Sequence, residues 1–235
     1  MLIQSEQIKA FIIDLDDTLY DCSNTLVVRG RRRVAKTIAG LLNCTEEKAY
    51  LLQQELEEKY GTRANIYEKL ASLHGLPQTC AKELLEEFVR VEISNIALFP
   101  DVTDTLLKLK LQGYKLFLVT SGEDRIQTQK IELLGLHVGY FDEIMITDRE
   151  LGHTKRNCFK QIMQKYTLKP EEIVCVGDKC DDELLTGKTF GMITVMFEHG
   201  RHYKAYLKET QKTVKPDYSI KHIQELLGLK CNQAL

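Results

Sequence analysis

Three aspartates stand close together near the start of the chain, where a short hydrophobic run ends. The segment FIIDLDDTLY, residues 11–20, places Asp14, Asp16 and Asp17 directly before Thr18. Carboxylates crowded in this way repel one another, and burying them is costly unless something compensates their charge. The cluster therefore indicates a chemical role for Asp14 and Asp16, whereas Asp17 and Thr18 also suit a turn.

Further polar residues lie at, or soon after, the ends of three other β-rich runs. They are Thr120, Ser121 and Gly122 near the end of 115–121, Lys155 in the loop beyond 143–147, and Asp178 with Asp181, Asp182 and Glu183 at and after the end of 172–178. In open α/β sheets, ligands bind outside the carboxyl ends of the strands. We therefore expect these groups to converge with the N-terminal aspartates.

The chemistry of the two sets is complementary. Asp14, Asp16 and Asp178 form an oxygen-rich acidic set that suits Mg²⁺, and a hard cation would relieve the repulsion among them. Thr120 supplies a hydroxyl and Lys155 a positive charge. The amides of Ser121 and Gly122 are expected to open a helix, which is an anion-binding arrangement. Together these groups describe a phosphate site, in which an aspartate can act as the nucleophile.

Two of these assignments have plainer alternatives. Thr120 could serve only as a helix cap, which is a common role of threonine. Lys155 could be a solvated surface lysine, as most lysines are.

Six short β-rich runs, each bounded by polar or turn residues, predict the strands that position these groups. They cover residues 8–14, 115–121, 143–147, 172–178, 192–197 and 216–219. Near-continuous hydrophobic runs are typical of parallel strands buried on both faces. Helical patterns separate the runs from residue 101 onward, so we predict an α/β fold with a doubly wound, mostly parallel sheet.

Residues 21–97 lack good strand signals and are predicted to form an inserted helical cap. Thr45 is the expected N-cap of one helix and Gly61 its expected end. The predicted domains are therefore a core of residues 1–20 and 98–235 and a cap of residues 21–97.

Composition excludes several classes of protein. Of the 235 residues, 43% are hydrophobic and 28% charged, and the net charge of −2 gives no reason to expect nucleic acid or a membrane as a partner. We expect no signal peptide and no membrane span. The seven cysteines form no C-x-x-C pair, which favours reduced thiols in a cytoplasmic protein over a zinc site. No oligomeric state is indicated.

The motifs resemble those of the haloacid dehalogenase superfamily over nearly the whole chain. DLDDTLY is similar to its first motif, D-x-D-x-T, and LFLVTSG to its second, a strand ending in threonine or serine. LGHTK supplies a candidate lysine for the third motif, although Arg156 stands where a proline commonly follows. VGDKCDDE is similar to the fourth motif, and the long insertion resembles the helical-cap subclass.

The resemblance implies a role for each matching residue. Asp14 would be the nucleophile, and Asp16 the general acid/base, whose main-chain carbonyl would also help to hold Mg²⁺. Thr120 and Lys155 would bind the transferring phosphoryl group. Asp178 would bind Mg²⁺ directly, with help from either Asp182 or Glu183, which the sequence does not distinguish; both also suit the start of a helix.

The leading interpretation is a Mg²⁺-dependent phosphatase that acts on a small phosphorylated metabolite through an aspartyl-phosphate intermediate. The segment EKYGTRANIYEKL weakly resembles the cap of pyrimidine nucleotidase-like members, so a nucleoside monophosphate is one candidate substrate and a sugar phosphate another. A phosphomutase with the same chemistry, or a non-catalytic ligand-binding member, remains an alternative. A dehalogenase is disfavoured because Asp16 occupies a position where that branch lacks a carboxylate, and a phosphoacceptor receiver domain would be much shorter.

A few other residues could contribute to a site. In the run RGRRR, Arg29 and Arg33 could share a helical face and bind an anionic substrate, but a solvated basic face is the plainer interpretation. His199 and His202 have a metal-like spacing without an evident third ligand, so we interpret them as surface residues. His153 could line the pocket beside Lys155. Cys22 and Cys180 are expected to be packing residues.

Overall fold

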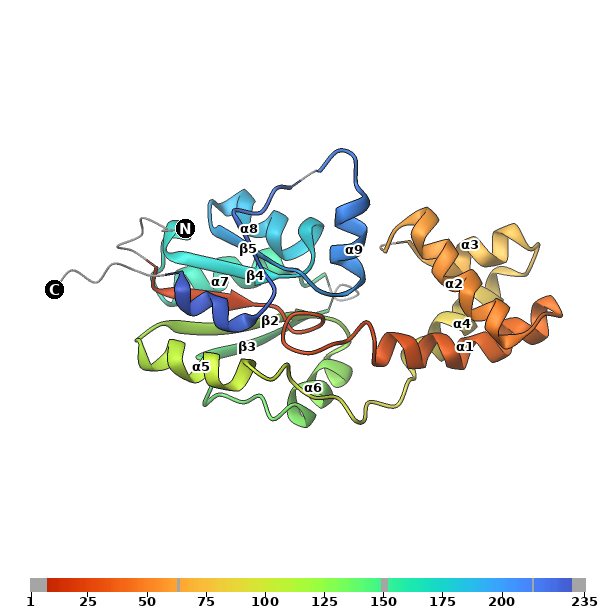
Figure 1. The fold of residues 1–235 in the computed structure, drawn as a ribbon, viewed down its shortest axis with the longest axis horizontal. Helices are drawn as coiled ribbons and strands as arrows, with labels where there is room; N and C mark the ends of the chain where they lie inside the picture. The colour runs from red at the N-terminus through yellow and green to blue at the C-terminus, as the bar shows by residue number, and fades with distance from the viewer. Residues whose placement is uncertain (1–7, 63, 149–151, 213, 230–235) are drawn as a thin grey trace. The chain divides into compact units, whose positions relative to one another are not determined.

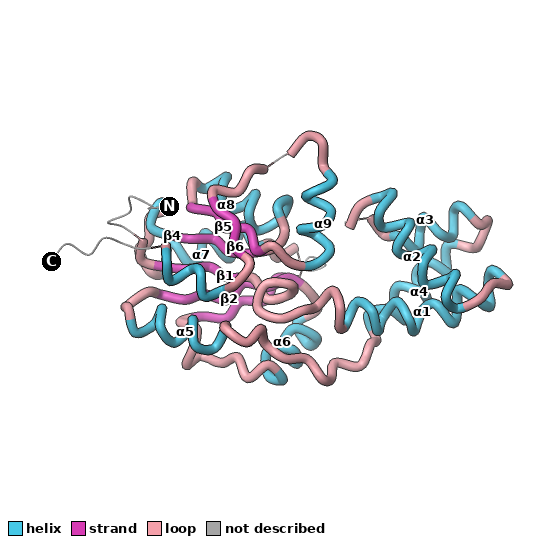
Figure 2. The backbone as a smooth tube through the Cα atoms, viewed as in Figure 1, coloured by secondary structure: helices cyan, strands magenta, loops and turns pink. Residues whose placement is uncertain are grey.

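Six parallel strands form one sheet, in the order β3-β2-β1-β4-β5-β6 (Figures 1 and 2). The computed structural model describes residues 8–62, 64–148, 152–212 and 214–229. The strands are β1 (Ala10–Ile13), β2 (Lys115–Ser121), β3 (Glu143–Thr147), β4 (Ile173–Gly177), β5 (Ile193–Phe197) and β6 (Tyr218–Ile220). Each of them lies within or at the edge of a predicted run.

The central strand β1 is buried on both faces. Ala10 and Ile12 pack on one face against Phe159 and other residues of helix α7 (Lys155–Lys165). Phe11 and Ile13 are also buried, on the opposite face. Because successive side chains of a strand point to opposite sides, full burial of four consecutive residues requires cover on both faces of the sheet. The prediction of a doubly wound α/β fold is confirmed.

Further helices alternate with the strands along the chain, beginning with α5 (Val102–Leu111), which precedes β2. The others are α6 (Asp124–Leu133), α8 (Leu185–Phe190) and α9 (Gly200–Lys208), together with 3₁₀ turns at Pro170–Glu172 and Ile223–Gly228 and a π-helical turn at Cys180–Leu184. Helix α5 buries Val102, Leu106 and Leu109 completely, at the spacing of one helical face.

The chain divides into two compact units. The α/β unit comprises Met1–Asp21 and Ser94–Leu235, and the helical unit comprises Cys22–Ile93. The helical unit contains α1 (Leu26–Leu42), α2 (Glu46–Tyr60), α3 (Ile66–Leu73) and α4 (Gln78–Val89). Its core includes Ile38, Leu70 and Leu84, all fully buried to within 1%.

The ends of α2 agree with the sequence signals. The Lys48 amide donates a hydrogen bond to the Thr45 hydroxyl at 3.2 Å, which satisfies one of the free donors of the first helical turn. Gly61 follows the helix with φ of +88°, a conformation that favours glycine.

Buried polar groups of the helical unit are joined in a network. Arg31 Nη2 lies 2.7 Å from Glu57 Oε1, and the two side chains are 9% and 12% exposed. Gln53 is fully buried; its Nε2 donates to the Arg31 carbonyl at 3.0 Å, and its Oε1 accepts from the Tyr67 hydroxyl at 3.1 Å. We name these four residues the Arg31 network. Each of these polar contacts joins a donor or cation to an acceptor or anion.

The RGRRR run is not a solvated basic face throughout. Arg31 is buried, and Arg33 Nη1 donates to the Arg90 carbonyl at 3.1 Å, with Glu87 at 3.8 Å from its Nε. Arg33 is therefore engaged within the helical unit. Arg29 is partly buried and has partners of its own.

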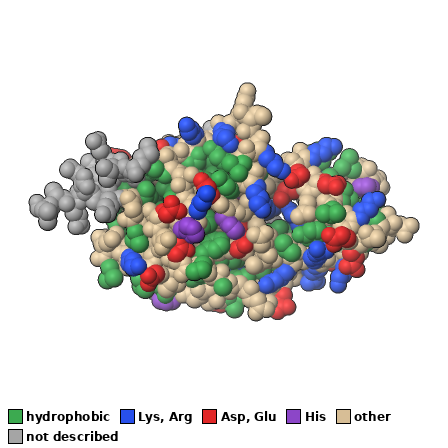
Figure 3. All heavy atoms as spheres, in the orientation of Figure 1, with side chains coloured by type: hydrophobic (Ala, Val, Ile, Leu, Met, Phe, Trp, Pro, Cys, Tyr) green, Lys and Arg blue, Asp and Glu red, His purple; other side chains and the backbone are tan. Residues whose placement is uncertain are grey.

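Among the described residues, no helix is both long and apolar enough to cross a membrane. On the face drawn in Figure 3, basic and acidic side chains occur together rather than in one region of a single sign.

Candidate active site

The candidate active site lies where the order of strands reverses, at the carboxyl ends of β1 and β4. These two strands are hydrogen-bonded neighbours, and the Asp14 amide extends the pairing by donating to the Val176 carbonyl at 3.0 Å. Asp14 follows β1 directly, and Asp178 follows β4 directly. A reversal of strand order opens a crevice at this edge of the sheet, which is where open α/β sheets bind ligands.

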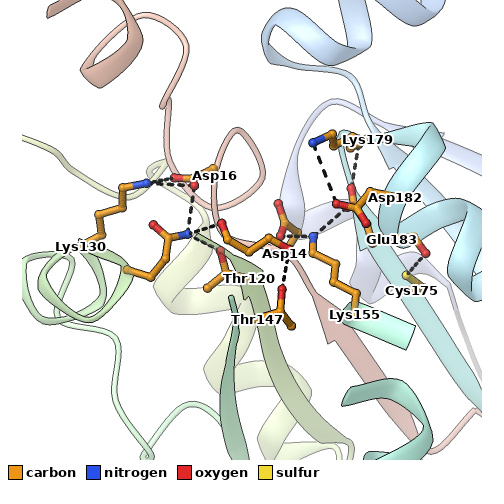
Figure 4. A network of polar contacts seen from close by, with 12 residues as sticks. Asp14, Asp16, Thr120, Lys130, Thr147, Lys155, Cys175, Lys179, Asp182 and Glu183 are labelled. Atoms are coloured by element: carbon orange, nitrogen blue, oxygen red, sulfur yellow. Dashed lines mark hydrogen bonds and ion pairs between the residues drawn. The ribbon is translucent and has the colours of Figure 1, made fainter. Parts of the chain in front are cut away.

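Three carboxylates gather there. Oxygens of Asp14, Asp178 and Glu183 lie within 4.8 Å of one another, and the residues are 7%, 2% and 2% exposed. Lys155 Nζ lies 2.6 Å from Asp14 Oδ1 and 2.8 Å from Glu183 Oε2 (Figure 4). Asp178 Oδ2 is buried and has no hydrogen-bond partner within the described parts of the chain. Three carboxylates with one ammonium group leave an excess of negative charge.

The residues present fit a hard divalent cation. The donor set consists of carboxylate oxygens, which Mg²⁺ prefers. The orphaned oxygen of Asp178 supplies an independent sign, because a buried oxygen without a partner is costly and rare in a folded protein.

The π-helical turn (Cys180–Leu184) places Glu183, rather than Asp182, in the carboxylate group. It turns the Glu183 side chain back toward β4, where Glu183 Oε1 accepts a hydrogen bond from the Lys179 amide at 2.8 Å. A Cβ atom at Gly177 would collide with the Glu183 carboxylate, so this approach requires glycine at that position. Asp182 instead lies 3.9 Å from Lys179 Nζ and is not a member of the carboxylate group.

Burial sets the protonation behaviour of the group. It raises the pKa of Asp14 to about 7, with Lys155 opposing the shift and Glu183 adding to it. Burial, followed by the charge of Glu183, also holds the pKa of Asp178 well above its ordinary value. Burial alone would lower the pKa of Lys155, but Asp14 and Glu183 outweigh it and raise that pKa. The lysine therefore stays charged between its two acidic partners.

Lys155 reaches the site because it begins α7. The Thr154 hydroxyl caps this helix by accepting a hydrogen bond from the Asn157 amide at 3.3 Å. Lys155 is only 4% exposed, so the alternative of a solvated surface lysine is wrong. His153, two residues earlier, is exposed.

A second polar cluster surrounds Asp16. Lys130 Nζ lies 2.9 and 3.0 Å from its two carboxylate oxygens, and the Tyr20 hydroxyl donates to Oδ1. Gln127 Nε2 lies 3.1 Å from Asp16 Oδ2 and 2.6 Å from the Thr120 hydroxyl oxygen. Burial would raise the pKa of Asp16, but Lys130, Tyr20 and Gln127 outweigh it and lower that pKa.

Gln127 and Lys130 were not predicted from the sequence as members of the site. A signal was present, because both stand at the spacing of the buried face of α6, where they are 1% and 7% exposed. A glutamine and a lysine on the face that should be hydrophobic indicate a polar partner beneath the helix.

One expectation about the phosphate site is wrong. Ser121 ends β2 and α6 begins only at Asp124, so the amides of Ser121 and Gly122 do not open the helix. The Gly122 amide donates instead to the Thr147 carbonyl at 3.0 Å, and the Ser121 and Thr147 hydroxyls share a hydrogen bond of 2.7 Å. The chain keeps pairing with β3 beyond Thr120 before it turns.

Asp17, Asp21 and His199 form another group. His199 Nε2 lies 3.0 Å from Asp21 Oδ1, and ligand atoms of all three residues lie within 4.8 Å of one another. His199 is thus partly buried against acidic residues from the other end of the chain, and His202 is not part of this group. Asp17 adopts φ of +57°, which agrees with its expected place in a turn.

The two cysteines beside the acidic motifs, Cys22 and Cys180, are buried, as expected of packing residues.

A match to a protein family identifies the class of enzyme to which this geometry corresponds. Residues 8–191 match the model of the haloacid dehalogenase-like hydrolases. The chain belongs to this family. The matched segment contains every residue of the two polar clusters described above, and the resemblance noted in the motifs is confirmed.

Two archaeal relatives are similar over almost their whole length. The glyceraldehyde 3-phosphate phosphatase of Methanocaldococcus jannaschii is 32% identical over 96% of this chain and 98% of its own. That of Methanopyrus kandleri is also 32% identical, over 94% and 97%. The chain is therefore an enzyme, a phosphatase of the haloacid dehalogenase superfamily.

Solved structures agree with the fold. The crystal structure of a haloacid dehalogenase-type phosphatase from Thermococcus onnurineus superposes with a TM-score of 0.61, at 24% identity, over 94% of this chain and 97% of its own.

Proposed function

We propose that this enzyme is a Mg²⁺-dependent phosphatase that hydrolyses a small phosphorylated metabolite through an aspartyl-phosphate on Asp14. The observation that carries the proposal is the buried group of Asp14, Asp178 and Glu183 beside Lys155, with its orphaned oxygen on Asp178. Asp14 and Asp178 would hold Mg²⁺ with the main-chain carbonyl of Asp16. We propose Glu183 rather than Asp182 as the supporting acid, because only Glu183 lies in the group.

The cation, when bound, would offset the negative charge of the carboxylates and of the phosphate. Lys155 and the Thr120 hydroxyl would bind the phosphoryl oxygens. Both groups are buried, so their contacts with a phosphate would be little weakened by water. Ser121 stays a candidate only through its side-chain hydroxyl, and Gly122 only if its amide gives up the Thr147 carbonyl.

The reaction would use two carboxylates in sequence. An oxygen of Asp14 attacks phosphorus, the bond from phosphorus to the leaving oxygen breaks, and Asp16, which must enter this step protonated despite its lowered pKa, gives that oxygen its proton. Asp16 then takes a proton from water, which attacks the aspartyl-phosphate and releases inorganic phosphate with the Asp14 carboxylate restored.

The substrate class rests on the relatives. Both archaeal proteins described above are phosphatases of glyceraldehyde 3-phosphate, so a sugar phosphate of this small size is favoured over a nucleoside monophosphate. The six cysteines among the described residues are free thiols, which supports the expectation of a reducing, cytoplasmic compartment.

A phosphate-release assay tests the proposal. The purified enzyme, with Mg²⁺, is offered glyceraldehyde 3-phosphate, larger sugar phosphates and nucleoside monophosphates, and the organic products are analysed as well. Release of inorganic phosphate that requires both Mg²⁺ and Asp14 supports it. Conversion of a sugar phosphate to its isomer without phosphate release would identify a phosphomutase, and equal rates without any metal would contradict the metal assignment.

A further inference from the structure

We propose that Lys130 is a positioning residue for acid/base catalysis: with Gln127 it fixes the carboxylate of Asp16 in the orientation that proton transfer requires. This inference rests on the proposed function, because it concerns the step assigned to Asp16. It adds a contribution from α6, an element that carries none of the four sequence motifs.

Three side chains hold the Asp16 carboxylate, and each of its two oxygens has at least two contacts. Lys130 Nζ contacts both oxygens, at 2.9 and 3.0 Å, and so opposes rotation of the carboxylate plane. The Tyr20 hydroxyl contacts one oxygen and Gln127 Nε2 the other. The Asp16 side chain is still 29% exposed, so packing alone does not hold it. Its orientation therefore depends on these polar contacts.

Gln127 also links Asp16 to the phosphate-binding hydroxyl. Its Nε2 lies 2.6 Å from Thr120 Oγ1 and 3.1 Å from Asp16 Oδ2. The Gln127 side chain is held in turn against Gly122, where a Cβ atom would stand 3.1 Å from it and where φ is +153°. The proton-transferring group and a group that binds the transferring phosphoryl are thus set from the same face of one helix.

The burial of Lys130 supports a role beyond tying α6 to the sheet. Lys108, on the exposed side of α5, pairs with Asp104 while remaining 55% exposed, as surface lysines commonly do. The Lys130 side chain is only 9% exposed, so its ammonium has been withdrawn from water in order to meet Asp16. Small displacements of a catalytic group reduce rates strongly, which is why the groups that support it matter.

The test compares substrates with poor and good leaving groups in the variant Lys130→Met. For an alkyl phosphate such as glycerol phosphate, we expect kcat to fall about tenfold to a hundredfold, which is part of the loss expected when acid/base catalysis is removed, with KM changed less than about twofold. In single-turnover phosphoryl transfer from p-nitrophenyl phosphate, whose leaving group needs little protonation, the loss should be much smaller. Lys130→Arg, which keeps the charge and its donors, should recover part of the rate.

A matched control uses another lysine–aspartate pair of the same unit. Lys110 Nζ lies 3.1 Å from Asp142 Oδ2, with side chains 29% and 13% exposed. Lys110→Met should leave the ratio of the two substrates unchanged. An equal loss of both activities in Lys130→Met, or a change in KM alone, would overturn the positioning role. If Lys130→Met does not fold, as judged by circular dichroism, the comparison is made with Lys130→Gln.

A double variant separates this inference from the proposed function. If Lys130 acts through Asp16, Lys130→Met should have little further effect in the Asp16→Asn background. Independent multiplication of the two losses would contradict the inference while leaving the function intact. Wild-type rates in Asp16→Asn itself would instead contradict the acid/base assignment on which the inference rests.

Discussion

The two units both bury charged side chains, but they balance those charges differently. In the Arg31 network, one guanidinium meets one carboxylate at 2.7 Å, and Gln53 satisfies its neighbours with hydrogen bonds. In the active site, Asp14 and Glu183 share the single ammonium of Lys155, and one oxygen of the neighbouring Asp178 has no partner among the described residues. Both units bury charged groups, but of these two clusters only the one in the active site has more negative than positive charge.

The difference distinguishes a structural polar cluster from a functional one. A balanced cluster needs nothing further, and breaking it costs stability. An unbalanced cluster costs stability while it stands alone and gains it when the missing charge arrives. Substitutions in the Arg31 network should therefore mainly lower stability, whereas substitutions in the active-site cluster should mainly lower activity.

The largest effect is expected at the nucleophile. Asp14→Asn should lower kcat by about ten-thousandfold or more, because an amide is a far poorer nucleophile than a carboxylate. The folded structure should persist, since the substitution removes one of three crowded charges. Phosphate release by the purified variant and its thermal unfolding curve check both parts. Substantial Mg²⁺-dependent turnover would remove Asp14 from this role.

Removal of the metal should be nearly as severe. Chelation by EDTA should stop turnover and added Mg²⁺ should restore it, because the uncompensated carboxylates would repel the phosphate dianion. An unchanged rate in thoroughly chelated enzyme would refute the proposed metal dependence.

The pH dependence of the free energy of unfolding provides a second test of the proposed metal site. Because the pKa of Asp14 is raised from 3.8 to about 7, the folded state holds this proton more tightly than the unfolded state. Asp14 should therefore reduce the stability of the chelated protein progressively as the pH rises from about 4 to about 7, and not at lower pH. Unfolding of the chelated wild type and Asp14→Asn across this range measures the difference, which Mg²⁺ should diminish.

Asp16→Asn should have the next largest effect. Loss of general acid/base catalysis typically costs about a hundredfold to ten-thousandfold, and the cost should shrink for good leaving groups in the phosphoryl-transfer step. Hydrolysis of the aspartyl-phosphate should stay slow, so rapid-quench experiments should detect accumulated phosphoenzyme. Wild-type rates with both kinds of substrate would show that another group transfers the proton.

The Arg31 network should respond in stability. Arg31→Met leaves Glu57 buried without its cation, and we expect a loss of about 3 kcal/mol in the free energy of unfolding. Denaturant titration measures it. Arg32→Met is the matched control, because Arg32 pairs with Glu47 at the surface, where the side chains are 53% and 61% exposed. It should cost about 1 kcal/mol or less. Similar costs for the two variants would contradict the distinction between the clusters.

The strands and the principal carboxylates could be predicted from the sequence. Hydrophobic runs such as 115–121 identify buried strands because parallel strands are covered on both faces. Asp14 and Asp178 could be placed because each directly follows such a run, and neighbouring parallel strands end at the same edge of the sheet.

Details that depend on local backbone geometry could not be predicted. The choice of Glu183 over Asp182 depends on a π-helical turn, which changes the direction of successive side chains and has no clear sequence pattern. The contacts of Asp16 with Lys130 depend on how α6 packs, 114 positions along the chain. The two ends of the helical unit, Cys22 and Ile93, lie near the expected limits of 21–97 and depend on how the connecting segments pack.

The position of β1 has a consequence for how the enzyme loses activity on heating. This strand pairs with β2 on one side and β4 on the other, and the Asp14 amide itself donates to the Val176 carbonyl. Local fluctuations that fray loops and edge strands such as β6 do not break such contacts, whereas whole-molecule unfolding does. The amide of the nucleophile should thus rank among the slowest to exchange its hydrogen for deuterium. Thermal inactivation through loss of the nucleophile's position would then coincide with global unfolding of the α/β unit.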